Sequence, residues 1–130
     1  MRKTVMITAA LLMLAGSAHA SENPVLLTGK DLRNAVSGKT IYIQTPIGAE
    51  IPVRYRPNGT MNGSSSTQLA MLAGEKVKAD TGRWWVRRAE LCQQWSSWSN
   101  GRAHCYKLRA AGKKVVWSRS DGETGTARLD

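Results

Sequence analysis

The chain has 130 residues and a formal net charge of +10. That length excludes several large domains and predicts one domain with a modest core. Because the chain contains five tryptophans and no phenylalanine, tryptophan must supply much of the aromatic packing of that core.

The first twenty residues have the three parts of a secretory signal. Arg2 and Lys3 form a basic end, residues 5–15 form an apolar run too short to span a membrane, and residues 18–20 form a small-x-small cleavage pattern. We therefore expect cleavage before Ser21, a single β domain over residues 21–130, and export to the periplasm or beyond. No other segment is apolar enough for a membrane-spanning helix, so we expect no transmembrane segment.

The mature chain would keep 17 basic and 9 acidic residues, a net charge of +8. Such a charge favours anionic partners, such as phosphorylated glycolipids, acidic polysaccharides or anionic lipids. The alternative is that the charge serves only solubility. An exported protein is not expected to meet nucleic acid as a physiological partner, although its basic charge would support salt-sensitive binding in vitro.

One helix is predicted over residues 28–38. Thr28 is its expected N-cap, and Asp31 stands where a capping-box acid can reach back to it. Leu32 and Val36 share one apolar face, and Gly38 ends the helix. A helix this short is stable only if that face packs on another element. The sequence leaves open whether it closes one end of a barrel.

From Thr40 onward the hydrophobic period is two, which is typical of strands. Strands are predicted over 40–45, 51–56, 83–88, 90–97, 103–110, 115–120 and 125–129. A further strand begins at 60–61, and 68–74 is assigned to strand rather than helix. Turns are predicted at 46–48, 57–59, 80–82, 100–101, 112 and 121–122. A short helix followed by seven or eight antiparallel strands indicates a mainly β fold, either a small meander barrel or a coiled sheet, calycin-like in shape.

Four of the five tryptophans lie between residues 82 and 106, and strand alternation divides them. Trp84 shares a face with Val86 and is expected in the core, as are Trp95 and Trp117. Trp85 is expected to point outward between two arginines. Trp98, at the predicted hairpin tip, is also expected to be exposed. Exposed tryptophan beside arginine suits stacking on sugar rings or cation–π contact, unless the arginines merely cover the ring.

Cys92 and Cys105 are the only cysteines, and an exported chain favours a disulfide between them. A two-residue turn at 100–101 would place them roughly 13 Å apart along the strands, too far for that bond. We therefore favour a four-residue loop over 97–100 that sets the cysteines opposite each other, with Gly101 in a positive-φ conformation. The two registers differ by an even number, so Leu91 and Trp95 face the core in both.

The sequence offers little for catalysis. The mature chain has one histidine, His104, which is too few with a disulfide for a zinc site. It has no nucleophile elbow, no phosphate-binding glycine loop, and no spacing that pairs two carboxylates. We expect no enzymatic activity, no cofactor and no metal. An enzyme that uses His104 is the least favoured alternative.

The segments GRWWV (82–86), LCQQW (91–95) and CYKL (105–108), with the Asp121-Gly122 turn, resemble small exported proteobacterial proteins of unassigned function. The resemblance covers roughly residues 25–129. It implies a compact β domain with a cysteine pair in the periplasm, and it implies no reaction.

These observations predict a monomeric binding module for an anionic envelope component or glycan. Its candidate binding residues are the outward cations and aromatic side chains Arg54, Arg56, Arg83, Trp85, Arg87, Arg88 and Trp98. Two alternatives remain open. One is a protein–protein element, such as an inhibitor or an envelope assembly factor. The other is a barrel that carries a small apolar ligand against Trp95 and Tyr106.

Overall fold

The computed structural model describes residues 23–64 and 79–130, which form nine strands, one α-helix and one short 3-10 helix. In chain order the elements are β1 (Val25–Leu26), α1 (Gly29–Val36), β2 (Thr40–Gln44), β3 (Glu50–Tyr55), β4 (Thr60–Gly63), β5 (Asp80–Arg87), β6 (Glu90–Trp95), η2 (Trp98–Gly101), β7 (Ala103–Ala111), β8 (Lys114–Arg119) and β9 (Thr124–Leu129). The predicted signal segment and the strand assigned to 68–74 lie outside the described residues.

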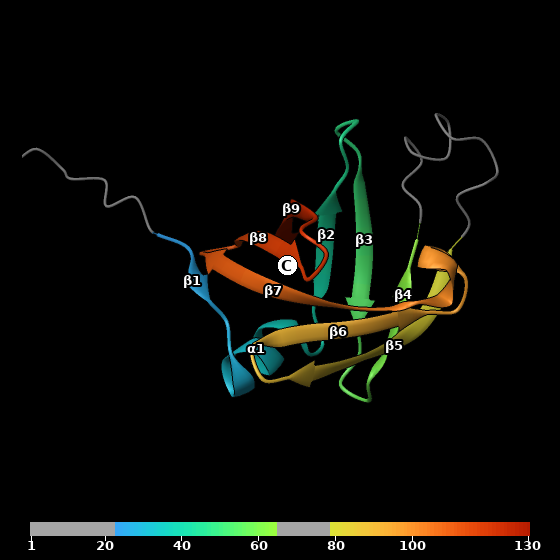
Figure 1. Ribbon diagram of the computed structural model, residues 1–130, viewed down its shortest axis with the longest axis horizontal. Helices are drawn as coiled ribbons and strands as arrows, with labels where there is room; N and C mark the ends of the chain where they lie inside the picture. Colours follow the sequence, from blue (N-terminus) through green and yellow to red (C-terminus); the bar gives the residue numbers. More distant parts are fainter. Residues whose placement is uncertain (1–22, 65–78) are drawn as a thin grey trace, which may run out of the picture.

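Strands β2 to β9 form a closed antiparallel barrel of eight strands (Figure 1). Each strand pairs with the next along the chain, and β9 returns to pair with β2. The short β1 is an extra strand that pairs with Arg109 and Ala110, near the end of β7. Strand β6 pairs only with the first part of β7, up to Tyr106. The predicted mainly β meander is therefore confirmed in its closed form. Closure removes the unpaired edges that an open sheet of this size would leave.

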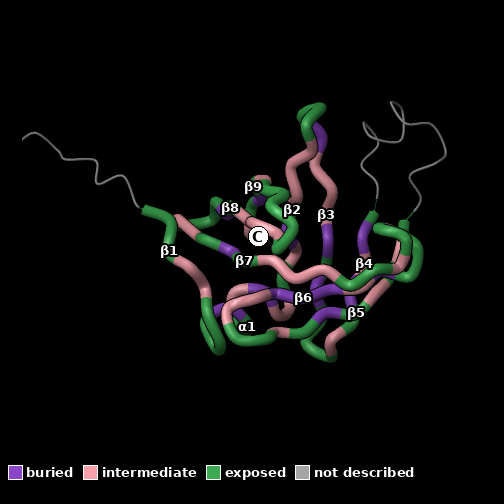
Figure 2. Tube along the Cα trace, viewed as in Figure 1, coloured by how far each residue is buried: buried purple, intermediate pink, exposed green. Residues whose placement is uncertain are grey.

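Alternation along each strand fills the barrel with apolar side chains. Figure 2 shows buried residues recurring along the strands around the barrel interior. Trp84, Trp95 and Leu91 are almost fully buried, as their spacing predicts, and Trp117 packs against them as a partly buried residue. With eight strands the interior is about wide enough for side chains to fill it or to hold one small ligand.

Helix α1 closes one end of the barrel. Its apolar face places Leu32 and Val36 in the core at 0% exposure. Gly29 N–H donates to the carbonyl of Arg88, and Gly38 N–H donates to the carbonyl of Tyr55, so the helix is fixed where β5 and β3 finish. Thr28 has the extended backbone of an N-cap, but its side chain makes no capping hydrogen bond, so the capping-box prediction is wrong in that respect.

The opposite end of the barrel, called the loop end below, carries the β2–β3, β6–β7 and β8–β9 connections. Midway along β6, Cys92 pairs with Cys105 of β7, and the two form a disulfide. This register is the one that disulfide geometry favours. The β6–β7 connection contains the 3-10 helix η2, in which Ser99, Asn100 and Gly101 all have positive φ.

The predicted turn at 80–82 is wrong, because these residues begin β5. Their place is set across the sheet rather than along the chain. Met61 pairs with Gly82 on one side, and Trp95 pairs with it on the other. A β-carbon at Gly82 would lie 2.3 Å from the carbonyl oxygen of Gln94, so glycine permits the close approach of β6.

Candidate functional site

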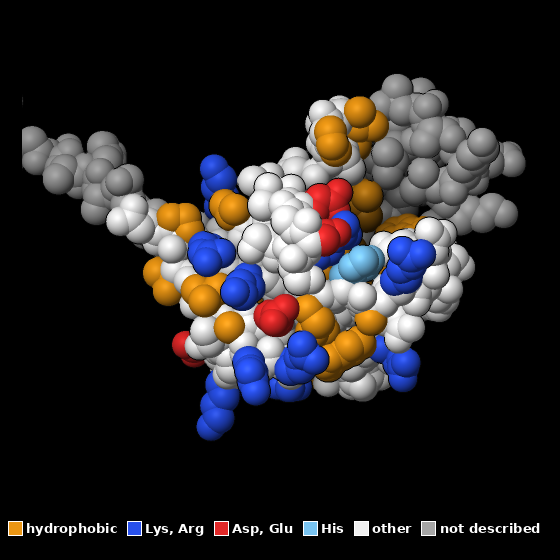
Figure 3. All heavy atoms as spheres, in the orientation of Figure 1, with side chains coloured by type: hydrophobic (Ala, Val, Ile, Leu, Met, Phe, Trp, Pro, Cys, Tyr) orange, Lys and Arg blue, Asp and Glu red, His pale blue; other side chains and the backbone are white. Residues whose placement is uncertain are grey.

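The outer surface of β5 presents one tryptophan between two arginines. Trp85 is 37% exposed, and Arg83 and Arg87 are exposed on the same face of the strand. Trp85 pairs with Cys92, which is itself fully buried and forms the disulfide with Cys105 of β7. On the side drawn in Figure 3, hydrophobic side chains lie over β5 and β6 with lysines and arginines around them. The predicted outward placement of Trp85 is confirmed.

Arg54 and Arg56 extend this basic surface onto the neighbouring strands. Arg54 is exposed on β3 and pairs with Asn62 of β4. Arg56 follows β3, where its N–H donates to the carbonyl of Thr60, and Thr60 pairs with Arg83. We call these five residues the Trp85 face: Arg54, Arg56, Arg83, Trp85 and Arg87. Arg88 lies outside the face, in the β5–β6 turn beside the start of α1, with φ of 58°.

An open groove of about 620 Å³ crosses β4, β5 and β6 at one side of the Trp85 face. Arg56 and Arg83 line it, together with Thr60 and Gln94. The neutral polar groups are engaged within the protein: Thr60 Oγ1 donates to Asn58 Oδ1 at 2.7 Å, and Gln94 Nε2 donates to the carbonyl of Gly101 at 3.0 Å. The guanidinium groups of Arg56 and Arg83 are the charged donors among the side chains that line the groove.

The arginines of the Trp85 face form no ion pair among residues 23–64 and 79–130, although Arg87 lies opposite Glu90 in the sheet. The ion pairs of this part of the chain join Arg119 to Asp121 and Glu123, and Arg128 to Glu50. Arg83 makes only a long contact of 3.4 Å to the amide oxygen of Gln94. The face therefore combines arginines that form no ion pair in this part of the chain with an exposed aromatic ring.

Trp98 does not belong to this surface, and the expectation that it is exposed is wrong. Its ring is partly buried, with its centroid 4.6 Å from that of Trp95. The backbone at Gly63 makes room for it, because a β-carbon there would lie 2.3 Å from Cζ3 of Trp98. Asp80 fixes the connection: its Oδ2 accepts the N–H of Ser97 at 2.8 Å and of Trp98 at 2.9 Å.

These hydrogen bonds to Asp80 also change its ionisation. Desolvation acts to raise the pKa of Asp80, but the backbone N–H groups of Trp98, Ser97 and Thr81 outweigh it and lower the pKa below its usual value. The carboxylate therefore stays charged while it holds the β6–β7 connection over the loop end.

A second concave site lies inside the barrel, toward the loop end. It is a cavity of about 180 Å³ with mainly apolar walls, lined in part by Ile43, Trp98, Tyr106 and Trp117. Trp95 and Tyr106 line it as the sequence predicts. The polar pair on its wall was not predicted: the hydroxyl of Tyr55 donates to Gln93 Oε1 at 2.8 Å, and both residues are buried. The sequence did contain the information to place Gln93 inside the barrel, because strand alternation puts it on the same face as Leu91 and Trp95.

Burial within the barrel raises the pKa of Tyr55, and the nearby Tyr106 adds to the effect. Tyr55 is therefore a neutral donor throughout the physiological pH range. His104 lies on the interior-facing side of β7, opposite Gln93. In the described part of the chain, no three His, Cys, Asp or Glu side chains are grouped so that they could hold a metal ion.

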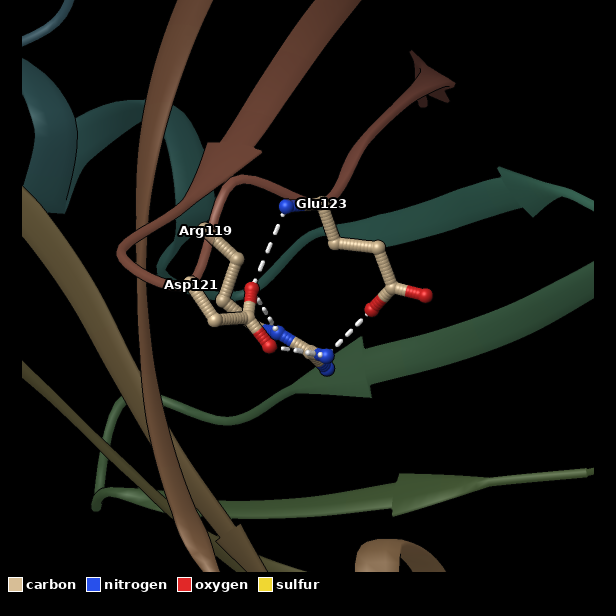
Figure 4. Close-up of polar contacts among 3 residues, drawn as sticks. All are labelled: Arg119, Asp121 and Glu123. Carbon is tan, nitrogen blue, oxygen red and sulfur yellow. Dashed lines mark hydrogen bonds and ion pairs between the residues drawn. The ribbon is translucent and has the colours of Figure 1, made fainter.

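One arginine lies at the loop end, two residues beyond the cavity-lining Trp117 on β8. Arg119 shares the inward face of β8 with Val115 and Trp117, and it lies opposite Tyr106 of β7. Figure 4 shows both neighbouring carboxylates directed at its guanidinium. Asp121 accepts from Nε at 2.9 Å and from an Nη at 2.6 Å, and Glu123 forms the third contact. These hydrogen bonds raise the pKa of Arg119, and they hold that of Asp121 at about 2.

Comparison with protein-family models, curated proteins and solved structures gave no significant match to this chain. Within residues 23–64 and 79–130, no helix has the length and hydropathy needed to cross a membrane. Any functional assignment therefore depends on the two concave sites and the Trp85 face.

Proposed function

We propose that this protein is an exported, non-enzymatic binding module that engages an anionic envelope component or glycan through the Trp85 face. The observation that supports this most directly is the exposed indole of Trp85 between Arg83 and Arg87, neither of which forms an ion pair among the described residues. Guanidinium groups bind phosphate and carboxylate in bidentate geometry, and an indole face stacks on sugar rings.

The groove beside the Trp85 face gives a ligand a concave place to bind next to these positive charges. Arg56 and Arg83 both line it, so an anionic group seated there would contact one guanidinium group from the end of β3 and one from β5. Two neighbouring cations favour a ligand that carries phosphate or carboxylate over a neutral one. The signal segment predicted at residues 1–20, together with the Cys92–Cys105 disulfide, supports an exported location.

The test is a titration of the oxidised protein with lipopolysaccharide, peptidoglycan fragments and anionic lipid vesicles at low and moderate salt. Tryptophan fluorescence is the readout. We expect saturable binding of one fraction that persists at moderate salt, and a loss of at least tenfold in affinity when Trp85→Ala is combined with Arg87→Gln. Because both side chains are exposed, the thermal unfolding midpoint should stay close to that of the wild type.

A matched control removes the same charge elsewhere. Lys30 and Arg33 are both exposed on α1, at the closed end of the barrel. The variant Lys30→Gln/Arg33→Gln should retain binding, whereas Arg83→Gln/Arg87→Gln should lose it. An equal loss in both variants, or binding that disappears with salt, would show that the positive charge acts only as a non-specific field. If no fraction binds and one protein co-purifies stoichiometrically, the partner is a protein.

A further inference from the structure

The interior cavity is separate from the Trp85 face and has the size of a small ligand. Its volume of about 180 Å³ is comparable to apolar protein cavities of roughly 150 Å³ that stay dry and accept a single aromatic ring. Ile43, Ile51, Val115 and Ala127 line it together with aromatic rings. Such walls favour a ligand that is mostly apolar.

The wall also carries hydrogen-bond donors. Trp117 lines the cavity, and its indole Nε1 is buried without a hydrogen-bond partner among the described residues. Gln93 Oε1 is occupied by the hydroxyl of Tyr55, but the Gln93 side chain carries two further N–H donors on Nε2. A buried donor without a partner is unfavourable, so a ligand that supplies an acceptor oxygen gains from meeting it.

The arginine beyond Trp117 on β8 does not favour an anionic ligand. Arg119 follows Trp117 on the inward face of β8, but Asp121 and Glu123 both pair with its guanidinium. Its positive charge is therefore already neutralised. This is the opposite of the Trp85 face, where the arginines have no such partners in the described chain.

We propose that the barrel cavity is a binding site for a small, uncharged, largely apolar molecule about the size of one aromatic ring, carrying one hydrogen-bond acceptor. The apolar walls bind the ring, and the donors of Trp117 and Gln93 orient the acceptor. This site does not depend on the proposed function of the Trp85 face.

Phenol and benzene are suitable probes because they differ by one hydroxyl. The readout is the indole N–H resonance of Trp117 in the ¹⁵N-labelled mature protein, assigned with Trp117→Phe. We expect phenol to displace this resonance saturably, with an affinity about fivefold higher than that of benzene, as one added hydrogen bond predicts. Equal affinities would overturn the role of the donors. No displacement by either probe at millimolar concentration would overturn the site.

The variant Ala127→Leu fills the cavity from β9 and should abolish phenol binding. Thr126→Leu adds the same side chain at an exposed position of the same strand and should leave binding unchanged. Retained binding in Ala127→Leu would place the probe elsewhere and overturn the proposal. If Ala127→Leu does not fold, xenon replaces it as the test on the wild-type protein. Shifts confined to nuclei of the cavity wall support the site, and their absence overturns it.

Discussion

Trp117 and Gly125 face each other across β8 and β9, and the indole lies so close to the glycine that a β-carbon there would be 2.4 Å from Cζ2 of Trp117. Gly125→Ala should therefore displace the indole and destabilise the protein by about 1–3 kcal/mol, the usual cost of overpacking. Urea denaturation measures this loss. Thr126→Ala, at the exposed neighbouring position, is the control and should change stability little. If Gly125→Ala were as stable as the wild type, the close packing would be wrong.

The disulfide should contribute substantially to stability, because it joins β6 and β7 across a connection with a sequence separation of 13. For a loop of that length the chain-entropy model predicts about 3 kcal/mol. The variant Cys92→Ala/Cys105→Ala should lose that amount in urea denaturation under oxidising conditions. In excess reductant the wild type should approach the variant. A variant that unfolds at the wild-type midpoint would contradict this prediction.

The buried pair of Tyr55 and Gln93 should be more sensitive to loss of one partner than of both. Tyr55→Phe removes the hydroxyl that donates to Gln93 Oε1 and leaves a buried amide oxygen without its donor. We expect a loss of about 1–3 kcal/mol in the free energy of unfolding. In the double variant Tyr55→Phe/Gln93→Met, the amide that lost its donor is also removed, so part of the lost stability should be recovered. If the double variant is less stable than the sum of the two single variants predicts, this account of the pair is wrong.

The segment from residue 82 to 106, which holds four of the five tryptophans, shows how much of the fold can be predicted from the sequence. Strand alternation was sufficient to bury Trp84 and expose Trp85, because both depend on the pleat of a single strand. Disulfide geometry was sufficient to choose between two registers, because only one brings Cys92 and Cys105 together. Both inferences needed no knowledge of distant strands.

The errors arose where a distant residue decides the outcome. Trp98 folds inward because Gly63, on β4, leaves space for its ring. Asp80 and Gly82 have low intrinsic strand preference, yet both lie in β5 because β4 and β6 pair with it on either side. The closure of β9 on β2 and the cluster around Arg119 likewise depend on contacts that no local pattern encodes.

The ion pairs of Arg119 should give the protein a distinct acid dependence. The folded state holds the pKa of Asp121 at about 2, chiefly through the Arg119 hydrogen bonds and the N–H of Glu123, whereas an unfolded aspartate titrates near 4. A lowered pKa means that the unfolded state binds more protons in this range. The stabilisation is therefore complete above about pH 4 and is lost as the pH falls toward 2.

Asp121→Asn removes this titration. The difference in urea midpoint between the wild type and Asp121→Asn should be constant from pH 7 to 5 and should shrink between pH 4 and 2. Carboxyl-carbon NMR provides the direct measurement, and in Arg119→Gln the pKa of Asp121 should rise toward its usual value because the main hydrogen-bond donor is gone. An unchanged pKa in Arg119→Gln would show that Arg119 does not control the carboxylate. The loop end would then be held by the backbone turn alone, through the N–H of Glu123 that Asp121 also accepts at 3.2 Å.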